Sequence, residues 1–407
     1  MNRGLRWMGI VWGACGCVVL GGRAAAGEPP LARAPAADQA ALEIEALVRQ
    51  LGDDEFAQRE RATEALIRLG VTATPALEVG MRDLDREVRY RCRRIINSVQ
   101  ALDRQRRLDA FAAGVQSSDE DQLPGWVRYR QLLGDDRLAR ELFCEMLKAE
   151  WEFLAAIEAG GPRAADALAT RCQELQNTQM MQQMFDQTGQ TIELGSIAAM
   201  VFVASNPEID VADQTGSYLY AALSSQPSFR SAIQSGTRKP IVRKLLGAWV
   251  RRVSGPWSAY HALMLSLQYD LEDGRVPAER IVRGDSAGPL HAQICQNAIL
   301  VLAKLGDESH IPLLEQRFAD ATPCSTQRID NAVTFETQVR DVALAAALHL
   351  SKQDVKKFGF DRAQLHPQLV FNPGTLGFNQ EKDDAARQRA FAGWRAFRAR
   401  SPAAAPP

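Results

Sequence analysis

Acidic pairs beside a glycine recur along this chain, as "LGDD" at 51–54 and 133–136 and as "LGDE" at 305–308. Neighbouring carboxylates could bind a divalent cation or act as general acid and base. A metal site needs converging ligands, whereas these copies are widely spaced between stretches of helical periodicity. We therefore interpret them as helix boundaries and predict no metal and no cofactor. The Leu ends one helix, the Gly takes the left-handed conformation, the first Asp caps the next helix and the second acid lies in its first turn.

Residues 284–288, "GDSAG", could supply a nucleophile through Ser286. The segment is similar to the nucleophile elbow of lipases and to the active-site signature of trypsin-like proteases. The elbow needs a strand before the serine on a parallel sheet, but the preceding residues 277–283 have a helical pattern. Possible triad partners follow Ser286 in hydrolase order, namely Asp341, His349 and His366. We interpret the segment as a turn between helices and predict that the chain is not an enzyme, with a serine hydrolase as the alternative.

A basic helix predicted over 86–107 presents a third kind of chemistry. Opposite its apolar side lie Arg86, Tyr90, Arg93, Arg94 and Asn97. Arginines beside a tyrosine suit an anionic partner, whether a carboxylate cluster on a protein, a glycan or nucleic acid. Because the chain is predicted to be exported, we expect no nucleic acid. The alternative is an ordinary solvated helix face.

The sulfur-containing residues have no metal-type spacing. Beyond the first 27 residues there are five cysteines, an odd number without a C-x-x-C motif. We expect them to be small buried apolar residues, with one disulfide left open. These are Cys92, Cys144, Cys172, Cys295 and Cys324. Met180, Met181 and Met184 could bind Cu(I), but helical core packing is the expected role.

The N-terminus has the features of a secretory signal peptide over 1–27. "MNRGLRW" is basic, "MGIVWGACGCVVLGG" is apolar but short for a membrane span, and small residues follow. We expect cleavage near Ala26 or Gly27 and a periplasmic or extracellular protein. A lipoprotein and an uncleaved anchor are the alternatives. No second apolar run has membrane length, so the mature form is predicted not to span a membrane.

Net charge argues against a general polyanion binder. The chain has 48 basic and 49 acidic residues, and the signal peptide removes three arginines and no acids. The mature chain therefore has a net charge of −4, which gives no overall attraction to polyanions.

The elements that would position these residues are helical throughout. Apolar residues recur at helical spacing in 55–70, 86–99, 292–305 and 335–350, and no run alternates as a strand would. From 51 to 133 is 82 residues and from 133 to 305 is 172, close to two and four units of about 41–43 residues. The pattern predicts an all-α fold built from repeated helical pairs.

Two stretches resemble HEAT repeats, "VTATPALEVGMRDLDREVRYRCRRII" and "QNAILVLAKLGDESHIPLLEQRFAD". The C-terminal part, with "QVRDVALAAALHLSKQDVKKFGF", is similar to a group of exported bacterial HEAT-like proteins of unassigned activity. The resemblance implies an α-solenoid, an armadillo-like superhelix. The predicted organisation is a signal peptide at 1–27, a Pro/Ala linker at 28–37, N-terminal HEAT-like repeats at 38–112, an irregular helical middle at 113–287, C-terminal HEAT-like repeats with a capping helix at 288–400, and a disordered tail at 401–407.

The resemblance also implies a function class. Helical repeats commonly provide extended binding surfaces, so we expect a non-enzymatic exported scaffold or adaptor for a protein or envelope partner. The alternatives are the serine hydrolase and a structural envelope protein that self-associates. The oligomeric state stays open. For the C-terminus, Leu344 and Leu348 lie opposite the main apolar face of their helix, and we expect Phe391, Trp394 and Phe397 of the last helix to cover it.

Overall fold

The computed structural model describes residues 36–114, 123–158, 160–185, 192–285, 291–329, 333–380 and 384–400. Helices make up most of these residues, as the apolar periodicity predicts. The chain divides into two compact units, residues 1–106 and 107–407. The predicted signal peptide, the first eight residues of the predicted linker and the predicted tail lie outside the described residues. None of the described helices combines the length and apolar character needed to cross a membrane.

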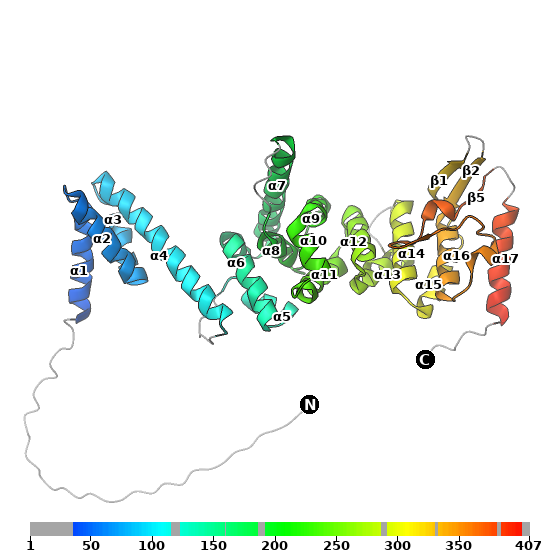
Figure 1. Cartoon of the computed structure of the whole chain (residues 1–407), viewed down its shortest axis with the longest axis horizontal. Helices are drawn as coiled ribbons and strands as arrows, with labels where there is room; N and C mark the ends of the chain where they lie inside the picture. Colours follow the sequence, from blue (N-terminus) through cyan, green and yellow to red (C-terminus); the bar gives the residue numbers. More distant parts are fainter. Residues whose placement is uncertain are drawn as a thin grey trace, which may run out of the picture. The chain divides into compact units, whose positions relative to one another are not determined.

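The first unit consists of helices joined by tight turns, and the last of them is the longest (Figure 1). They are α1 (Ala36–Gln50), α2 (Phe56–Leu69), the 3₁₀ turn η1 (Gly70–Ala73), α3 (Thr74–Gly80) and α4 (Arg86–Ala112), whose last turns belong to the second unit. Helix α2 ends at Leu69 and is capped by Gly70, which has a φ of 65°. Pro75 lies in the first turn of α3, where its missing N–H costs no hydrogen bond. Helix α1 begins at Ala36, two residues before the predicted start of the repeats.

The core of the first unit is one apolar cluster. The predicted inward face of α4 is confirmed, because each of its apolar side chains is buried, namely Val88, Cys92, Ile95, Ile96 and Val99. They pack with Leu51 after α1, Leu66 of α2 and Leu77 of α3, all fully buried.

Two arginines bind the chain in the same way, 30 residues apart. Arg59 Nη1 donates hydrogen bonds of 2.6 and 3.0 Å to the carbonyls of residues 53–54, which precede α2. Arg89 Nη1 donates bonds of 2.7 and 2.8 Å to the carbonyls of residues 83–84, which precede α4. Each guanidinium therefore holds the loop that leads into its own helix.

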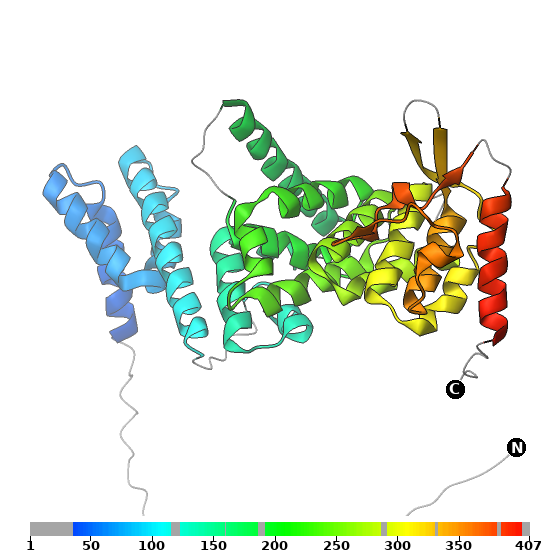
Figure 2. The same ribbon diagram turned by 45° about the vertical axis from the view of Figure 1, so that its right-hand side comes forward.

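The second unit is a longer helical array (Figures 1 and 2). Its helices are α5 (Trp126–Leu133), α6 (Arg137–Ile157), α7 (Gly161–Phe185), α8 (Leu194–Ala204), α9 (Asp213–Ser225), α10 (Pro227–Gln234), α11 (Lys239–Arg252), α12 (Pro256–Tyr269), α13 (Arg275–Arg283), α14 (Ala292–Leu305), α15 (Ile311–Glu315), α16 (Val339–Leu350) and α17 (Ala385–Arg400). Short 3₁₀ turns are η3 (Glu272–Gly274), η4 (Glu308–His310), η5 (Val355–Phe358) and η6 (Pro373–Thr375). Helix α6 packs on α8, α8 on α11, α9 on α12, α12 on α14 and α14 on α16, so each helix contacts elements near it in the sequence.

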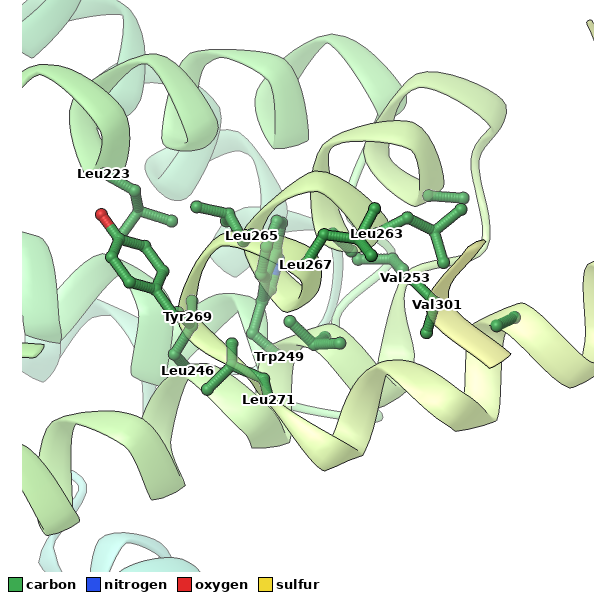
Figure 3. Packing of buried hydrophobic residues seen from close by; sticks show 14 of the residues in the cluster. Leu223, Leu246, Trp249, Val253, Leu263, Leu265, Leu267, Tyr269, Leu271 and Val301 are labelled. Carbon is green, nitrogen blue, oxygen red and sulfur yellow. The ribbon is translucent and has the colours of Figure 1, made fainter. Parts of the chain in front are cut away.

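One continuous apolar core runs through this unit. Figure 3 shows its centre, where Trp249 of α11 is surrounded by leucines of α12 and by Leu271 before η3. At its start Trp126 is fully buried, with its ring centroid 4.6 Å from that of Phe111. Edge-on aromatic pairs of this kind add to the stability that burial provides.

The expectation that the chain has no strands was wrong. Strands β1 (Pro323–Ile329), β2 (Val333–Gln338) and β5 (Phe378–Asn379) form an antiparallel sheet in the order β1-β2-β5, and β3 (Leu365–His366) pairs with β4 (Val370–Phe371). Phe335, expected on a helix, pairs with Gln327 across the β1–β2 ladder. The reason is that residues 333–337 are β-branched or aromatic except Glu336, a composition that fits a pleated, half-buried surface.

The last helix packs on α16 as predicted, while its three aromatic residues form ring contacts with Phe318 and Phe358. Leu344 and Leu348 are fully buried, and α17 packs against α16 and η5. Trp394 of α17 is buried, and its Nε1 donates a 2.9 Å hydrogen bond to Glu315 Oε1. Phe391 and Phe397 are only partly buried beside this core.

The glycines of the repeated acidic motif do not all act as predicted. Gly134 has a φ of 95° after α5, but Gly52 and Gly306 do not have positive φ. These two glycines are needed because other atoms lie too close to leave room for a side chain. A Cβ on Gly306 would lie 2.4 Å from Leu302 O, and one on Gly52 would lie 2.8 Å from Val88 Cγ2. The glycine is therefore needed for space at two positions and for conformation at one.

The acids of the motif cap helices, though not always through the predicted residue. Asp307 is the N-cap of η4 and accepts the main-chain N–H two residues on at 2.9 Å. At 135–136 it is the second acid, Asp136, that caps α6, by accepting Ala139 N–H at 2.9 Å. Asp53 accepts a main-chain N–H in the turn before α2 and is not its N-cap. The interpretation as helix boundaries holds, while the assignment of the capping residue was wrong at two sites.

The methionine prediction was also wrong, whereas the cysteine prediction is confirmed. Met180 and Met181 are each 54% exposed in the C-terminal part of α7, which extends away from its neighbours in Figures 1 and 2. Met184's side chain is outside the described residues. The five cysteines after the predicted signal peptide are buried and free of disulfides.

Candidate interaction surface

The five residues predicted to bind a partner lie together on α4. Arg86, Tyr90, Arg93, Arg94 and Asn97 are all exposed, and Tyr90 is 63% exposed. Their spacings of four, three and four residues from 86 to 97 bring them to one side of the helix, opposite its buried apolar side. We call these five residues the arginine face.

The five arginines in the first three turns of α4, at positions 86–94, fall into two groups. Arg89 is bound to the preceding loop, and Arg91 is buried in ion pairs. Arg86, Arg93 and Arg94 have no carboxylate within 4.0 Å among the residues that the structure describes. Their charges are therefore available to an external anion.

Arg91 was missed by the sequence analysis, and it fixes the position of the arginine face. It is 7% exposed, its Nε donates to Glu87 Oε1 at 2.7 Å, and its Nη1 donates to Glu60 Oε1 at 2.8 Å. Nη1 also lies 3.2 Å from Thr63 Oγ1, so the side chain connects α4 to α2. Burial opposes the charge, but the two carboxylates outweigh it and raise the pKa of Arg91.

The partner of Arg91 lies on the neighbouring helix. Glu60 of α2 is only partly exposed because it is bonded to Arg91. The sequence could have predicted that Arg91 points inward, because it lies three residues after the apolar residue Val88 and so on the same side of the helix. Its partner could not be read from the local pattern because Glu60 is on another helix.

Position along the helix gives a further indication for Arg86. It lies in the first turn of α4, where the helix dipole disfavours a positive charge. Asp85, just before the helix, uses its Oδ1 to accept the N–H of Glu87. Arg86 is therefore not placed where its charge would stabilise the helix.

An apolar residue missed by the sequence analysis stands beside this surface. Leu84 lies two residues before Arg86 in the turn between α3 and α4, and it is almost fully exposed. The sequence could have predicted its exposure, because this leucine lies between Asp83 and Asp85 in a turn, where small or polar residues are favoured.

Arginine and tyrosine, the main residues of the arginine face, are among the residue types that most often dominate binding energy at protein interfaces.

The residues considered for hydrolysis have other contacts. Ser286 lies outside the described residues. The Asp341 carboxylate accepts hydrogen bonds from Arg387 Nε at 2.7 Å and from Gln338 N–H at 2.9 Å. His349 packs edge-on against Phe371, and burial lowers its pKa. His366 Nδ1 accepts main-chain N–H groups within its own turn. Asp341 and these histidines thus serve the fold.

The described residues also contain no candidate metal-binding cluster. Within the described residues there is no group of three or more His, Cys, Asp or Glu side chains arranged to hold a metal ion.

No protein-family model and no curated protein matches this chain significantly. The arginine face is accordingly interpreted from its own geometry. It consists of three arginines without a carboxylate partner among the described residues, one aromatic ring and one carboxamide, on a helix whose opposite side packs in the core and is held by Arg91.

Proposed function

We propose that the chain is an exported, non-enzymatic helical-repeat scaffold that binds an acidic protein or envelope partner through the arginine face. The observation that carries the proposal is the division of the five arginines at positions 86–94 of α4. Arg89 and Arg91 are bonded within the protein, while the other three lack a carboxylate partner in the described part of the chain. A fixed group of unpaired guanidinium groups suits carboxylates, which guanidinium can bind in a bidentate way.

The repeat architecture of the proposal is supported by local structure in the first unit. Arg59 and Arg89 make the same hydrogen bonds to the loop before their own helix. Each lies in the first turn of a helix that follows an acidic turn. Their 30-residue separation is shorter than the 40–47 residues of HEAT repeats because α3 between them has only seven residues. In the second unit, the packing of helices on near neighbours in the sequence favours a solenoid.

The experiment compares two double charge reversals in the first unit. Arg93→Glu with Arg94→Glu inverts the arginine face, and Arg61→Glu with Arg68→Glu makes the same change in charge on exposed positions of α2. Tagged wild-type and variant proteins are used to capture partners from envelope extract, and the recovered proteins are quantified. We expect Arg93→Glu/Arg94→Glu to lose an acidic partner that the α2 variant retains. The loss should be larger at low salt, because screening is weaker there.

Two results of this capture experiment would contradict binding through the arginine face. Equal recovery of the same partners by both variants would show that the arginine face is only a solvated surface. Equal loss by both variants would show a nonspecific effect of net charge. Circular dichroism of both variants should match the wild type, because none of the four substituted arginines is buried.

Export is tested separately. Sequencing the N-terminus of the native protein should give a mature chain beginning near Ala26 or Gly27, recovered from the periplasm or medium. A cytosolic protein that retains residues 1–27 would contradict the proposed location.

A further inference from the structure

A second surface with different chemistry lies in the second unit. A groove of about 460 Å³ is lined by α12, α14, β1 and the segment 369–374. That volume is within the range of sites for small ligands. The groove shares no residue with the arginine face, which is in the first unit.

The lining of the groove is uncharged. Each of its lining residues is neutral, and carboxamide side chains are prominent among them. The carboxamides are Gln293, Gln296 and Asn297 of α14, Gln327 of β1 and Asn372. A carboxamide offers two donors and an acceptor, so a wall of them matches a ligand whose polar groups both donate and accept without carrying charge.

Two of these carboxamides are buried without full hydrogen bonding. Gln296 is 8% exposed, and its Oε1 accepts no hydrogen bond from the described protein groups. Asn297 is 6% exposed, and its Nδ2 lies 3.5 Å from Met264 Sδ, a weak acceptor. Buried polar groups are normally hydrogen-bonded, so the unsatisfied Oε1 of Gln296 and the weakly bonded Nδ2 of Asn297 beside the groove favour a polar ligand.

One aromatic ring of α12 lines the groove and a second lies close to the first. Tyr260 is in its wall, and the Tyr260 and Trp257 ring centroids lie 6.1 Å apart. Trp257 is 53% exposed and lies near His291, which precedes α14. Exposed aromatic rings provide flat apolar surfaces for the C–H faces of a ligand that is polar at its edges.

The groove is better suited to binding than to covalent chemistry. Cys324 is part of its wall, but its Sγ is 3.3 Å from Thr337 O, to which it donates. Burial is the main reason that the pKa of Cys324 is raised to about 12. The thiol is therefore protonated at neutral pH and is a poor nucleophile.

From this arrangement we propose that the groove binds an uncharged saccharide. Hydroxyl groups along a sugar ring both donate and accept, as carboxamides require, and the ring's C–H faces can lie on Tyr260 or Trp257. An uncharged peptide is the competing occupant, and the test below includes it. The proposal is independent of the partner of the arginine face.

The test uses the full chain on an array of neutral oligosaccharides of glucose, galactose, mannose and N-acetylglucosamine. The glycan with the strongest signal is then titrated by calorimetry. We expect saturable 1:1 binding, weakened at least about tenfold in Gln296→Met, which removes a buried carboxamide that would bond to the glycan. Gln268→Met, on an exposed position of α12 outside the groove, is the matched control and should bind as the wild type does.

A second variant protects the test against misfolding. Gln293 is exposed at the groove, so Gln293→Ala should leave the fold intact and still weaken binding of the same glycan. The proposal is overturned if no neutral glycan binds. It is also overturned if the groove variants bind equally well, or if an uncharged Gly-Ser-Asn peptide displaces the bound glycan.

Discussion

The buried ion pair between α16 and α17 gives a prediction whose size follows from its geometry. Asp341 is fully buried, and Arg387 Nε and Nη2 donate to its two carboxylate oxygens at 2.7 and 3.1 Å. Arg387 also pairs with Asp384 and donates to Glu336 O at 3.2 Å, so one side chain joins α17 to α16 and β2. Arg387→Met keeps much of the apolar volume but removes every one of these bonds.

The expected cost comes from the carboxylate left behind. Breaking a buried pair by removing one partner typically costs about 3–5 kcal/mol, because the remaining charge stays buried without compensation. In Arg387→Met, Asp341 keeps its bond from Gln338 N–H but loses its counter-ion. We therefore expect the free energy of unfolding of the C-terminal region to fall by about 3–5 kcal/mol at neutral pH. The double variant Asp341→Asn/Arg387→Met should recover most of this loss, since it leaves no buried charge.

The pH dependence has a definite sign. Burial raises the pKa of Asp341 despite Arg387, and losing Arg387 should raise it further. A carboxyl group with a folded-state pKa above its unfolded value contributes stability that is fully present below the unfolded pKa and is lost as pH rises through the folded pKa. The deficit of Arg387→Met relative to wild type should therefore shrink as pH falls from neutral toward about 4.

The assay is urea unfolding followed by circular dichroism, with hydrogen exchange of residues 385–400 to locate the change. Arg389→Met, on an exposed position of the same helix, is the matched control and should differ from wild type by less than about 0.5 kcal/mol. If Arg387→Met is as stable as that control, or if the double variant is no better than the single one, the buried pair does not hold α17 in place.

Three further predictions follow from the described contacts. Deleting residues 385–407 should destabilise the C-terminal region by at least the ~3–5 kcal/mol expected for losing buried Trp394, and unchanged thermal unfolding would contradict this. Arg91→Met should lower the free energy of unfolding of the first unit by about 1–3 kcal/mol in denaturant titrations, because its bonds to Glu60 and Glu87 are lost, whereas Arg94→Met should be neutral. Iodoacetamide near pH 8.5, where a free thiol is about half ionised, should label the five described cysteines only after unfolding. Burial raises their pKa values to about 11 or 12, so the folded state disfavours the thiolates and loses stability as pH rises above about 8.5; rapid labelling of the native protein would refute this assignment.

Features set by local spacing were predictable from the sequence. The buried side of α4 and the exposed side with Arg93 and Arg94 follow from the 3.6-residue period alone. The helix boundaries at the acidic motifs follow from glycine and aspartate chemistry, although the exact capping residue depends on how each turn is packed. The predicted arginine face was exposed for this reason.

Features set by distant partners were not predictable. Arg91 is inward by spacing, but its role depends on Glu60, 31 residues earlier. Met180 and Met181 lie in a helix, but the sequence of α7 does not indicate that its C-terminal part extends past the neighbouring helices and leaves these side chains exposed. The β1–β2 hairpin was missed because Phe335 fits the helical period of α16 as well as the strand.

The groove could not be predicted either, because it too is formed by residues far apart in the sequence. Its walls come from α12, α14, β1 and the segment 369–374, which are separated by up to about a hundred residues. Only the tertiary packing brings their carboxamides together.

Photo-crosslinking from the arginine face tests the central claim most directly. A benzophenone amino acid in place of exposed Tyr90 would be compared with the same residue in place of Glu64, which is exposed on α2. The proposed function predicts that irradiation in cells yields a discrete adduct from position 90, that the adduct contains an acidic partner, and that Arg93→Glu/Arg94→Glu abolishes it. Adducts of equal amount and identity from both positions, or an adduct at position 90 unaffected by the charge reversal, would contradict binding through the arginine face.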